Sequence, residues 1–208
     1  MEMTEKSLCE LRASLEGVMS PKRYRHTVEV ENMVARLAEL YAPEKKQMLR
    51  AAALLHDITK EYSTDQHRKV CADHGITVDA LMESAPKTFH AVTAAALIPT
   101  LYPDFADDEI VECVRWHTTA RADITVPEAL VYLADYIDMS RTFEDCVALR
   151  HYFWDAEPEK MSAQERTEHL RKTLILSLDM TIGALIEDGM TVSPDTFEAR
   201  NSLIVKGL

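Results

Sequence analysis

The chain is poor in the residues that interrupt helices. Of its 208 residues, only 5 are glycine and 8 are proline, about half of the usual combined share of about 12 %. Both residue types concentrate in turns and loops, so their scarcity favours an all-α protein with short connections. No stretch has the Pro, Gly and Ser bias of a linker, and the length suffices for one sizeable core. We therefore expect one domain over residues 1–208.

Three further features are missing from the sequence. No run of about 18 apolar residues occurs, so we expect no membrane-spanning helix. The first residues lack the cationic and then apolar pattern of a signal peptide, and there is no C-x-x-C pair. These observations predict a cytoplasmic protein with reduced thiols. They also predict that the four cysteines are small buried hydrophobic residues: Cys9, Cys71, Cys113 and Cys146.

Negative charge dominates the sequence. The formal net charge is −12 and the isoelectric point is near 5.1. A surface of this kind repels nucleic-acid polymers and anionic membranes, so we expect neither as a partner. A small phosphate-bearing substrate is not excluded, because bound cations dominate the field inside a site whatever the net charge.

Helix ends are well marked. Ser20 followed by Pro21 is an N-cap with proline at the first helical position, Ser162 with Glu165 forms a capping box, and Gly75 suits a helix C-terminus. With the apolar periodicity, these signals predict helices at about residues 21–41, 43–57, 64–74 (capped by Thr64), 86 onward, 107–118, 127–140, 163–189 and 194 onward.

Four of the eight histidines and two aspartates lie inside or at the end of apolar helical stretches: His26, His56-Asp57, His90, His117 and Asp135. The tightest segment runs from Ala51 through Leu55 directly into His56 and Asp57. Burying such ionisable groups without partners is costly. A divalent cation is the natural compensation, since neutral imidazole and carboxylate are its ordinary ligands.

The first set of candidate ligands comes from three helices. Neighbouring helical residues point about 100° apart, so His56 and Asp57 must approach an ion from two sides, or Asp57 must bridge. His26 from the preceding helix and Asp135 from a later one complete two imidazoles and two carboxylates. This mixed shell suits Fe²⁺, Mn²⁺, Co²⁺ or Zn²⁺ better than Mg²⁺, which prefers oxygen ligands.

The two remaining histidines have two interpretations. His90 and His117 hold a second ion, or they bind substrate phosphate beside a single ion, and the sequence leaves one or two ions open. Either case predicts that metal-activated water attacks an electrophile whose charge the cation neutralises. Lys60, one helical turn after Asp57, is placed to meet a phosphate oxygen.

Each candidate taken singly also has a structural explanation. A lone helical histidine is more often a packing or surface residue. Asp135 alone could be a hydrogen-bonded buried carboxylate, His117 could face its helix dipole, and Lys60 could be solvated. The conjunction of all these residues favours a site. Four other histidines have charged or polar neighbours, and we expect them at the surface: His67, His74, His151 and His169.

The order His26, His56-Asp57, Asp135 resembles the H…HD…D signature of the HD-domain metal-dependent phosphohydrolases. Six longer segments are similar, in the same order, to the bacterial HD-domain symmetrical bis(5′-nucleosyl)-tetraphosphatases, the diadenosine tetraphosphate hydrolases: KRYRHT, AALLHDITKE, PKTFHA, RWHTTAR, LADYIDMSRTF and EARNSL. The resemblance covers about residues 19–203. It implies an HD-domain helical bundle with its core at about 19–155 and C-terminal helices at about 156–208.

The resemblance also implies a reaction. Diadenosine tetraphosphate would be cleaved at its centre to two ADP, with Fe²⁺ as the expected ion. We also consider a homodimer as the assembly of the chain. The implied metal ligands are His26, His56, Asp57 and Asp135, with His90 and His117 for a second ion. The implied catalytic residues are Asp57 and Lys60. The implied substrate-binding residues are His26, Lys60, His90, His117, Thr118, Asp135 and Arg141, whose planar fork suits a nucleotide diphosphate.

One position departs from the family pattern, because Ala120 stands where glycine usually follows HTT. If that position needs a positive φ, alanine is strained there. Three alternatives remain: another HD-type nucleotidase or phosphodiesterase, a non-catalytic nucleotide-binding regulator, and a plain helical interaction module. The absence of a Gly-Tyr-Pro tripeptide counts against the cyclic-dinucleotide branch, and neither a Ser/His/Asp or Cys/His nucleophile arrangement nor a Gly-rich phosphate loop is visible.

Overall fold

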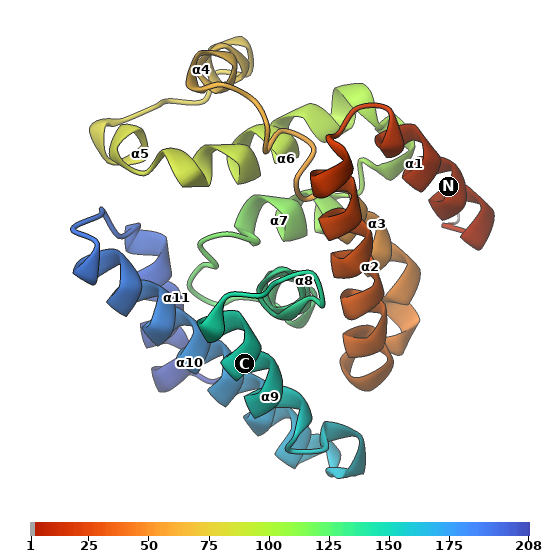
Figure 1. Cartoon of the computed structure of the whole chain (residues 1–208), viewed down its shortest axis with the longest axis vertical. Helices are drawn as coiled ribbons and strands as arrows, with labels where there is room; N and C mark the ends of the chain where they lie inside the picture. The colour runs from red at the N-terminus through yellow and green to blue at the C-terminus, as the bar shows by residue number, and fades with distance from the viewer. Residues whose placement is uncertain (1–2) are drawn as a thin grey trace.

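The computed structural model of the chain describes residues 3–208. Every regular element in this range is helical, which confirms the all-α prediction (Figure 1). The α-helices are α1 (Glu5–Glu16), α2 (Pro21–Tyr41), α3 (Lys46–Leu55), α4 (Thr64–Asp73), α5 (Ala80–Ser84), α6 (Phe89–Leu101), α7 (Asp108–Trp116), α8 (Val126–Ile137), α9 (Glu144–Trp154), α10 (Ala163–Glu187) and α11 (Pro194–Val205). Short 3-10 turns are η1 (Pro43–Lys45), η2 (Pro86–Thr88), η3 (Pro103–Phe105) and η4 (Pro158–Lys160).

Most helix starts follow the sequence signals. The Ser20 side chain accepts a hydrogen bond from the Arg23 amide, and Ser162 forms its capping box with Glu165. The cap of α4 is Ser63 rather than the predicted Thr64, because Ser63 Oγ faces the Gln66 amide. The structure also contains three helices that the sequence analysis did not predict: α1, α5 and α9.

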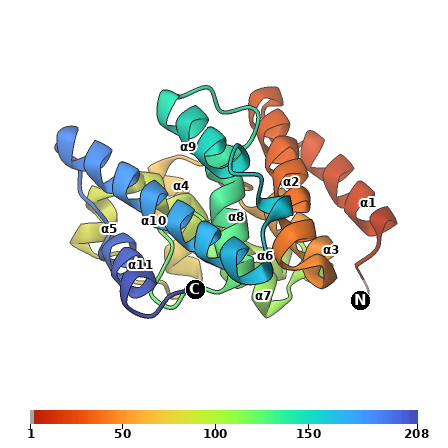
Figure 2. The same ribbon diagram turned by 90° about the horizontal axis from the view of Figure 1, so that it is seen from below.

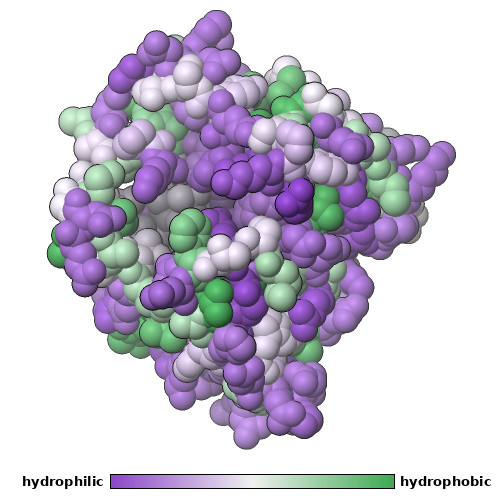
Figure 3. Space-filling model, viewed as in Figure 1, coloured by the Kyte–Doolittle hydropathy of each residue, from purple (hydrophilic) through white to green (hydrophobic). Residues whose placement is uncertain are grey.

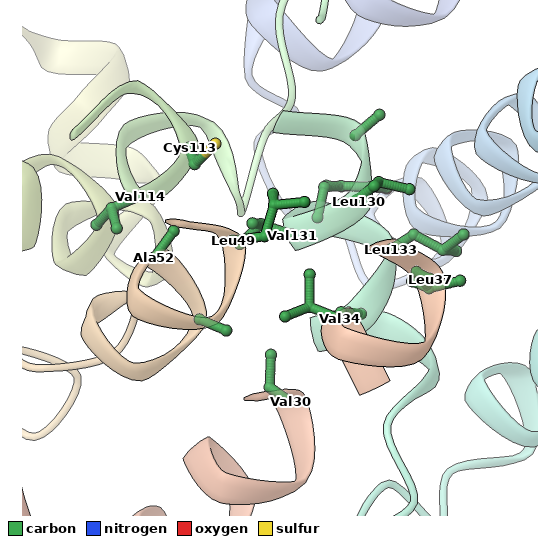
Figure 4. Close-up of a cluster of buried hydrophobic side chains, with 14 of the residues drawn as sticks. Val30, Val34, Leu37, Leu49, Ala52, Cys113, Val114, Leu130, Val131 and Leu133 are labelled. Atoms are coloured by element: carbon green, nitrogen blue, oxygen red, sulfur yellow. The ribbon is translucent and has the colours of Figure 1, made fainter. Parts of the chain in front are cut away.

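The core is formed where α2, α3, α7 and α8 pack together. Val30, Val34 and Leu37 on α2 face Leu49 of α3 and Leu130 of α8 (Figure 4). These side chains are fully buried. Burying such a residue contributes about 1.5–3 kcal/mol, so this contact fixes how α2, α3 and α8 lie against one another. The candidate ligands lie near the start of α2, directly after α3 and near the end of α8.

The last helices cover the other side of α8. α10 contacts α8, α9 and α11, and Figure 2 shows α10 crossing in front of α8 with α11 alongside it. The turn between α10 and α11 extends toward α5 (Figure 1). Within residues 3–208, no helix combines the length and the apolar character needed to cross a membrane.

Three sequence-based expectations about exposure were wrong. Cys9 is exposed, although the other three cysteines are buried as predicted. His67 and His169 are buried rather than at the surface. His67 Nδ1 lies 2.9 Å from Thr93 Oγ1 on α6, and His169 Nε2 donates to the Phe153 carbonyl at 3.0 Å. The polar partners come from other elements, so the local sequence did not reveal them.

Candidate metal centre

Four side chains from separate elements meet at one point. His26 lies in the second turn of α2, His56 and Asp57 in the turn directly after α3, and Asp135 in the last turn of α8. His26 Nε2 is 2.9 Å from Asp135 Oδ1 and 3.7 Å from Asp57 Oδ2. His56 Nε2 is 3.4 Å from Asp57 Oδ2 and 3.8 Å from Asp135 Oδ1. The structure therefore brings together the four residues expected to bind metal.

Backbone carbonyls orient three of the imidazoles in the same way. Each ring places Nδ1 within hydrogen-bond distance of the carbonyl three residues earlier: His56 with Ala53 at 2.6 Å, His90 with Lys87 at 2.8 Å and His117 with Val114 at 2.6 Å. A carbonyl only accepts, so Nδ1 carries the proton and Nε2 presents its lone pair. This arrangement is typical of histidines that bind metal ions.

Three ligand atoms of the four predicted metal-binding residues have no hydrogen-bond partner. They are His26 Nε2, His56 Nε2 and Asp57 Oδ1, in side chains that are 10 %, 0 % and 2 % exposed. An unsatisfied buried polar atom costs about 1–3 kcal/mol, and more when it is charged. A divalent cation would satisfy all three atoms, and the imidazole and carboxylate donors around them are the types that such ions bind. The residues therefore fit a metal ion.

His90 and His117 lie next to this point. Their Nε2 atoms are 3.0 Å apart, and His90 Nε2 is 3.3 Å from Asp57 Oδ1. Two donors face them, because Lys60 Nζ lies 3.0 Å from His90 Nε2 and Thr118 Oγ1 lies 3.2 Å from His117 Nε2. Burial lowers the pKa of His90 well below its ordinary value and that of His117 to about 4, which keeps both rings neutral.

Arginines neutralise the carboxylates. Arg23 Nη1 is 2.5 Å from Asp57 Oδ2, and Arg141 Nη2 is 2.6 Å from Asp135 Oδ1. Burial would raise the pKa of Asp57, but the surrounding polar and charged groups, the Lys60 ammonium among them, outweigh it and hold the pKa well below the usual range. Both carboxylates are therefore ionised, as metal ligands must be. Arg23 was not singled out from the sequence, although it precedes His26 by one helical turn.

Asp138 is a second residue that the sequence analysis missed. It is fully buried, and its Oδ2 lies 3.4 Å from His26 Nδ1. The Ser140 amide donates to its Oδ1 at 2.7 Å. Burial lowers the pKa of His26, but the carboxylates of Asp135 and Asp138 outweigh this effect and raise the pKa to about 9. The signal was available, since Asp138 follows Asp135 by three residues.

The loop after α7 contains a strained residue. Ala120 has a φ of 56° and is 1 % exposed. This left-handed conformation disfavours residues with a Cβ atom. The position does have a positive φ, so the backbone of Ala120 is strained as the sequence analysis expected for that case. A backbone hydrogen bond stabilises this loop, because Ala120 N donates to the Trp116 carbonyl at 2.9 Å. The bond closes the turn that contains His117 and Thr118.

The all-α fold and its buried cluster of imidazoles and carboxylates place the chain among helical metal-binding proteins. Residues 23–140, more than half of the chain, match the HD domain family, and they include every residue of the cluster. The chain belongs to the HD domain family. The family and the cluster together indicate that it binds a divalent metal ion.

Relatives and solved structures agree with this assignment. The chain is 28 % identical to the symmetrical bis(5′-nucleosyl)-tetraphosphatase of Bacillus subtilis (strain 168), covering 94 % of this chain and 96 % of the relative. It is 26 % identical to the protein of the same name from Staphylococcus aureus (strain NCTC 8325 / PS 47), with 86 % of each chain covered. It is also similar to the crystal structure of a predicted HD superfamily hydrolase involved in NAD metabolism from Clostridium acetobutylicum. That similarity has a TM-score of 0.79 and 27 % identity, and it covers 94 % of this chain and 95 % of the other.

Proposed function

We propose that the chain is a metal-dependent hydrolase that cleaves diadenosine tetraphosphate at its central anhydride to give two ADP. The observation that carries the proposal is the buried cluster around Asp57, whose Oδ1 and the nearby His56 Nε2 have no hydrogen-bond partner. The relatives named as symmetrical bis(5′-nucleosyl)-tetraphosphatases support this choice of substrate.

The metal ligands in this proposal are His26, His56, Asp57 and Asp135, whose mixed nitrogen and oxygen donors suit a divalent transition metal. Ferrous iron is the ion that the resemblance to the symmetrical bis(5′-nucleosyl)-tetraphosphatases implies. When bound, the ion supplies a Lewis acid, an activated water and neutralising charge. Arg23 pairs with Asp57 Oδ2, the oxygen that faces His26 and His56, and so holds the carboxylate in place beside these two rings. Asp138 and Ser140 contact His26 Nδ1 and orient the ring.

We infer a single ion rather than two. Lys60 Nζ lies 3.0 Å from His90 Nε2 and 4.0 Å from Asp57 Oδ1. An ammonium group in that place would repel a second dication held by His90 and His117. These two histidines instead accept hydrogen bonds from Lys60 and Thr118 and so position both donors for phosphate oxygens.

The remaining catalytic work is positioning and charge stabilisation, as is usual in phosphoryl transfer. Lys60 is 31 % exposed and Arg141 is 29 % exposed, so both cationic groups reach solvent from the rim of the centre. Lys60 and Thr118 would donate to oxygens of the attacked phosphate. Arg141 would present its remaining N–H groups to the departing ADP.

A substrate panel with resolved products tests the proposal. Protein reconstituted anaerobically with Fe²⁺ is expected to convert diadenosine tetraphosphate into ADP alone. NAD, cyclic dinucleotides and nucleoside monophosphates serve as the comparison substrates. Formation of AMP plus ATP, or faster turnover of a comparison substrate, would contradict the proposed activity. Tight dinucleotide binding without turnover by metal-loaded protein would instead indicate a regulator.

A further inference from the structure

A slot beside the metal centre has walls from two parts of the chain. Its volume is about 160 Å³. One wall comes from the family-matched region and contains Lys87, Thr118 and Thr119. The other comes from α10 and the segment after it, and contains Thr181, Leu185 and Met190. The surface is hollowed between α5 and the turn that joins α10 to α11 (Figure 3).

Two residues that line the slot also contact histidines beside the metal centre. Thr118 lines it, and Oγ1 of the same residue lies 3.1 Å from His90 Nε2 and 3.2 Å from His117 Nε2. Lys87 also lines it, and its carbonyl accepts the hydrogen bond from His90 Nδ1. A molecule with phosphates at the centre would therefore place its next group in this slot.

The wall chemistry suits a flat organic ring rather than another phosphate. Leu185, Met190 and the threonine methyl groups supply an apolar surface, and threonine and serine hydroxyls supply a few polar contacts. Apolar walls with a few polar groups are typical of small-molecule pockets. No carboxylate lines the slot within the described part of the chain, so nothing there repels an anionic nucleotide.

A second hollow of about 350 Å³ continues from the slot and shares Ala85, Thr88, Thr119 and Ser193 with it. Arg115 lies in this outer part, which Asp79 and Asp195 also line. Its guanidinium stacks on Trp116 at 4.1 Å and has no hydrogen bond or ion pair with any residue from 3 to 208. A free guanidinium fork matches the ring acceptors of a purine base.

We propose that this slot binds one nucleoside of the dinucleotide substrate. The base would pack against Leu185 and Met190, and its outer edge would reach toward Arg115. The assignment rests on the proposed function, because that function places the phosphates at the metal centre. It gives the helices after residue 140 a role in substrate recognition that the matched HD region alone does not supply.

Calorimetry with ADP and with pyrophosphate tests the slot on metal-loaded protein. Leu185→Trp fills the slot, whereas Ile186→Trp adds the same ring at a neighbouring position that is 62 % exposed and does not line it. We expect Leu185→Trp to weaken ADP binding at least about tenfold while pyrophosphate binding stays within about twofold of the parent. Ile186→Trp should change neither affinity. Met190→Trp, at the other end of the slot wall, should reproduce the selective loss if Leu185→Trp does not fold.

Measurements of binding and of hydrolysis test the nucleoside site and the proposed hydrolase activity separately. Unchanged ADP affinity in a folded slot variant, equal loss of ADP and pyrophosphate, or the same loss in Ile186→Trp would each overturn the nucleoside site. A selective loss of ADP binding in a protein that does not hydrolyse diadenosine tetraphosphate would support the slot and refute the proposed activity. Symmetrical hydrolysis with normal ADP binding in both slot variants would refute the slot alone.

Discussion

His56 Nδ1 lies 2.6 Å from the carbonyl oxygen of Ala53, one turn earlier at the end of α3. This hydrogen bond holds the proton on Nδ1 and turns the Nε2 lone pair toward Asp57. The imidazole of His56 and the carboxylate of Asp57, which follow the buried helix α3, therefore face each other at the metal centre. The same contact between ring and carbonyl recurs at His90 and His117, so the orientation is a property of the centre and not of one residue.

Removal of a central ligand should abolish metal binding and hydrolysis together. We expect His56→Ala and Asp57→Ala to lose the bound ion and to reduce turnover by at least about a hundredfold, since the ion supplies most of the charge stabilisation. Metal analysis and product formation measure both effects. His74→Ala, at an exposed histidine, is the matched control and should retain both. Normal turnover by metal-depleted Asp57→Ala would refute the assigned ligand.

Asp138→Asn should weaken metal binding without removing it. The change keeps the shape of a fully buried side chain but removes the charge beside His26 Nδ1. Loss of such a supporting contact typically lowers metal affinity about 10–100-fold. Competition with a chelator of known affinity measures the change. Asp104→Asn, at an exposed site remote from the centre, should leave the affinity unchanged, and an equally normal Asp138→Asn would rule out the orienting role.

Arg141→Ala should separate metal binding from substrate binding. Arg141 pairs with Asp135 but is 29 % exposed, so we expect the variant to retain the ion and to raise KM about tenfold through loss of phosphate contacts. Arg141→Lys should recover only part of the effect, because a single ammonium does not reproduce the bidentate fork. Steady-state kinetics with metal analysis provide the test. Loss of the ion in Arg141→Ala would mean that Arg141 serves Asp135 rather than substrate.

Glycine should be tolerated at position 120. The φ of 56° favours glycine, and relief of strain should offset both the lost methyl burial and the added chain entropy. We therefore expect Ala120→Gly to change the free energy of unfolding by less than about 0.5 kcal/mol. Ala129→Gly, at a buried helical alanine in α8, should cost about 2 kcal/mol. Equal losses in denaturant unfolding would contradict the strain at Ala120.

Local sequence signals accounted for the helices whose caps and apolar stripes lie within a few residues. Ser20-Pro21 and Ser162 mark the starts of α2 and α10 directly. The short helix α5 has no buried residue of its own, so it lacks the apolar periodicity that a prediction needs. The burial of His67 and His169 depends on Thr93 and Phe153 from other elements, and such contacts are not encoded in the neighbouring residues.

For the centre, the sequence predicted which residue types belong together but not their supporting contacts. The His-Asp pair after the buried run Ala51 to Leu55 required compensation, and the structure places His26 and Asp135 beside it. Arg23 and Asp138 were missed because each acts through another side chain across the fold. The slot near Leu185 could not be predicted, since it exists only where the C-terminal helices meet the loop that carries Thr118.

Anomalous diffraction at the iron absorption edge, from crystals of protein loaded anaerobically with Fe²⁺, tests the central claim most directly. We predict one strong peak, surrounded by the ligand atoms of four side chains: His26, His56, Asp57 and Asp135. A second peak beside His90 and His117 would contradict the single-ion assignment. A peak elsewhere, with none among the four side chains, would contradict the metal centre itself.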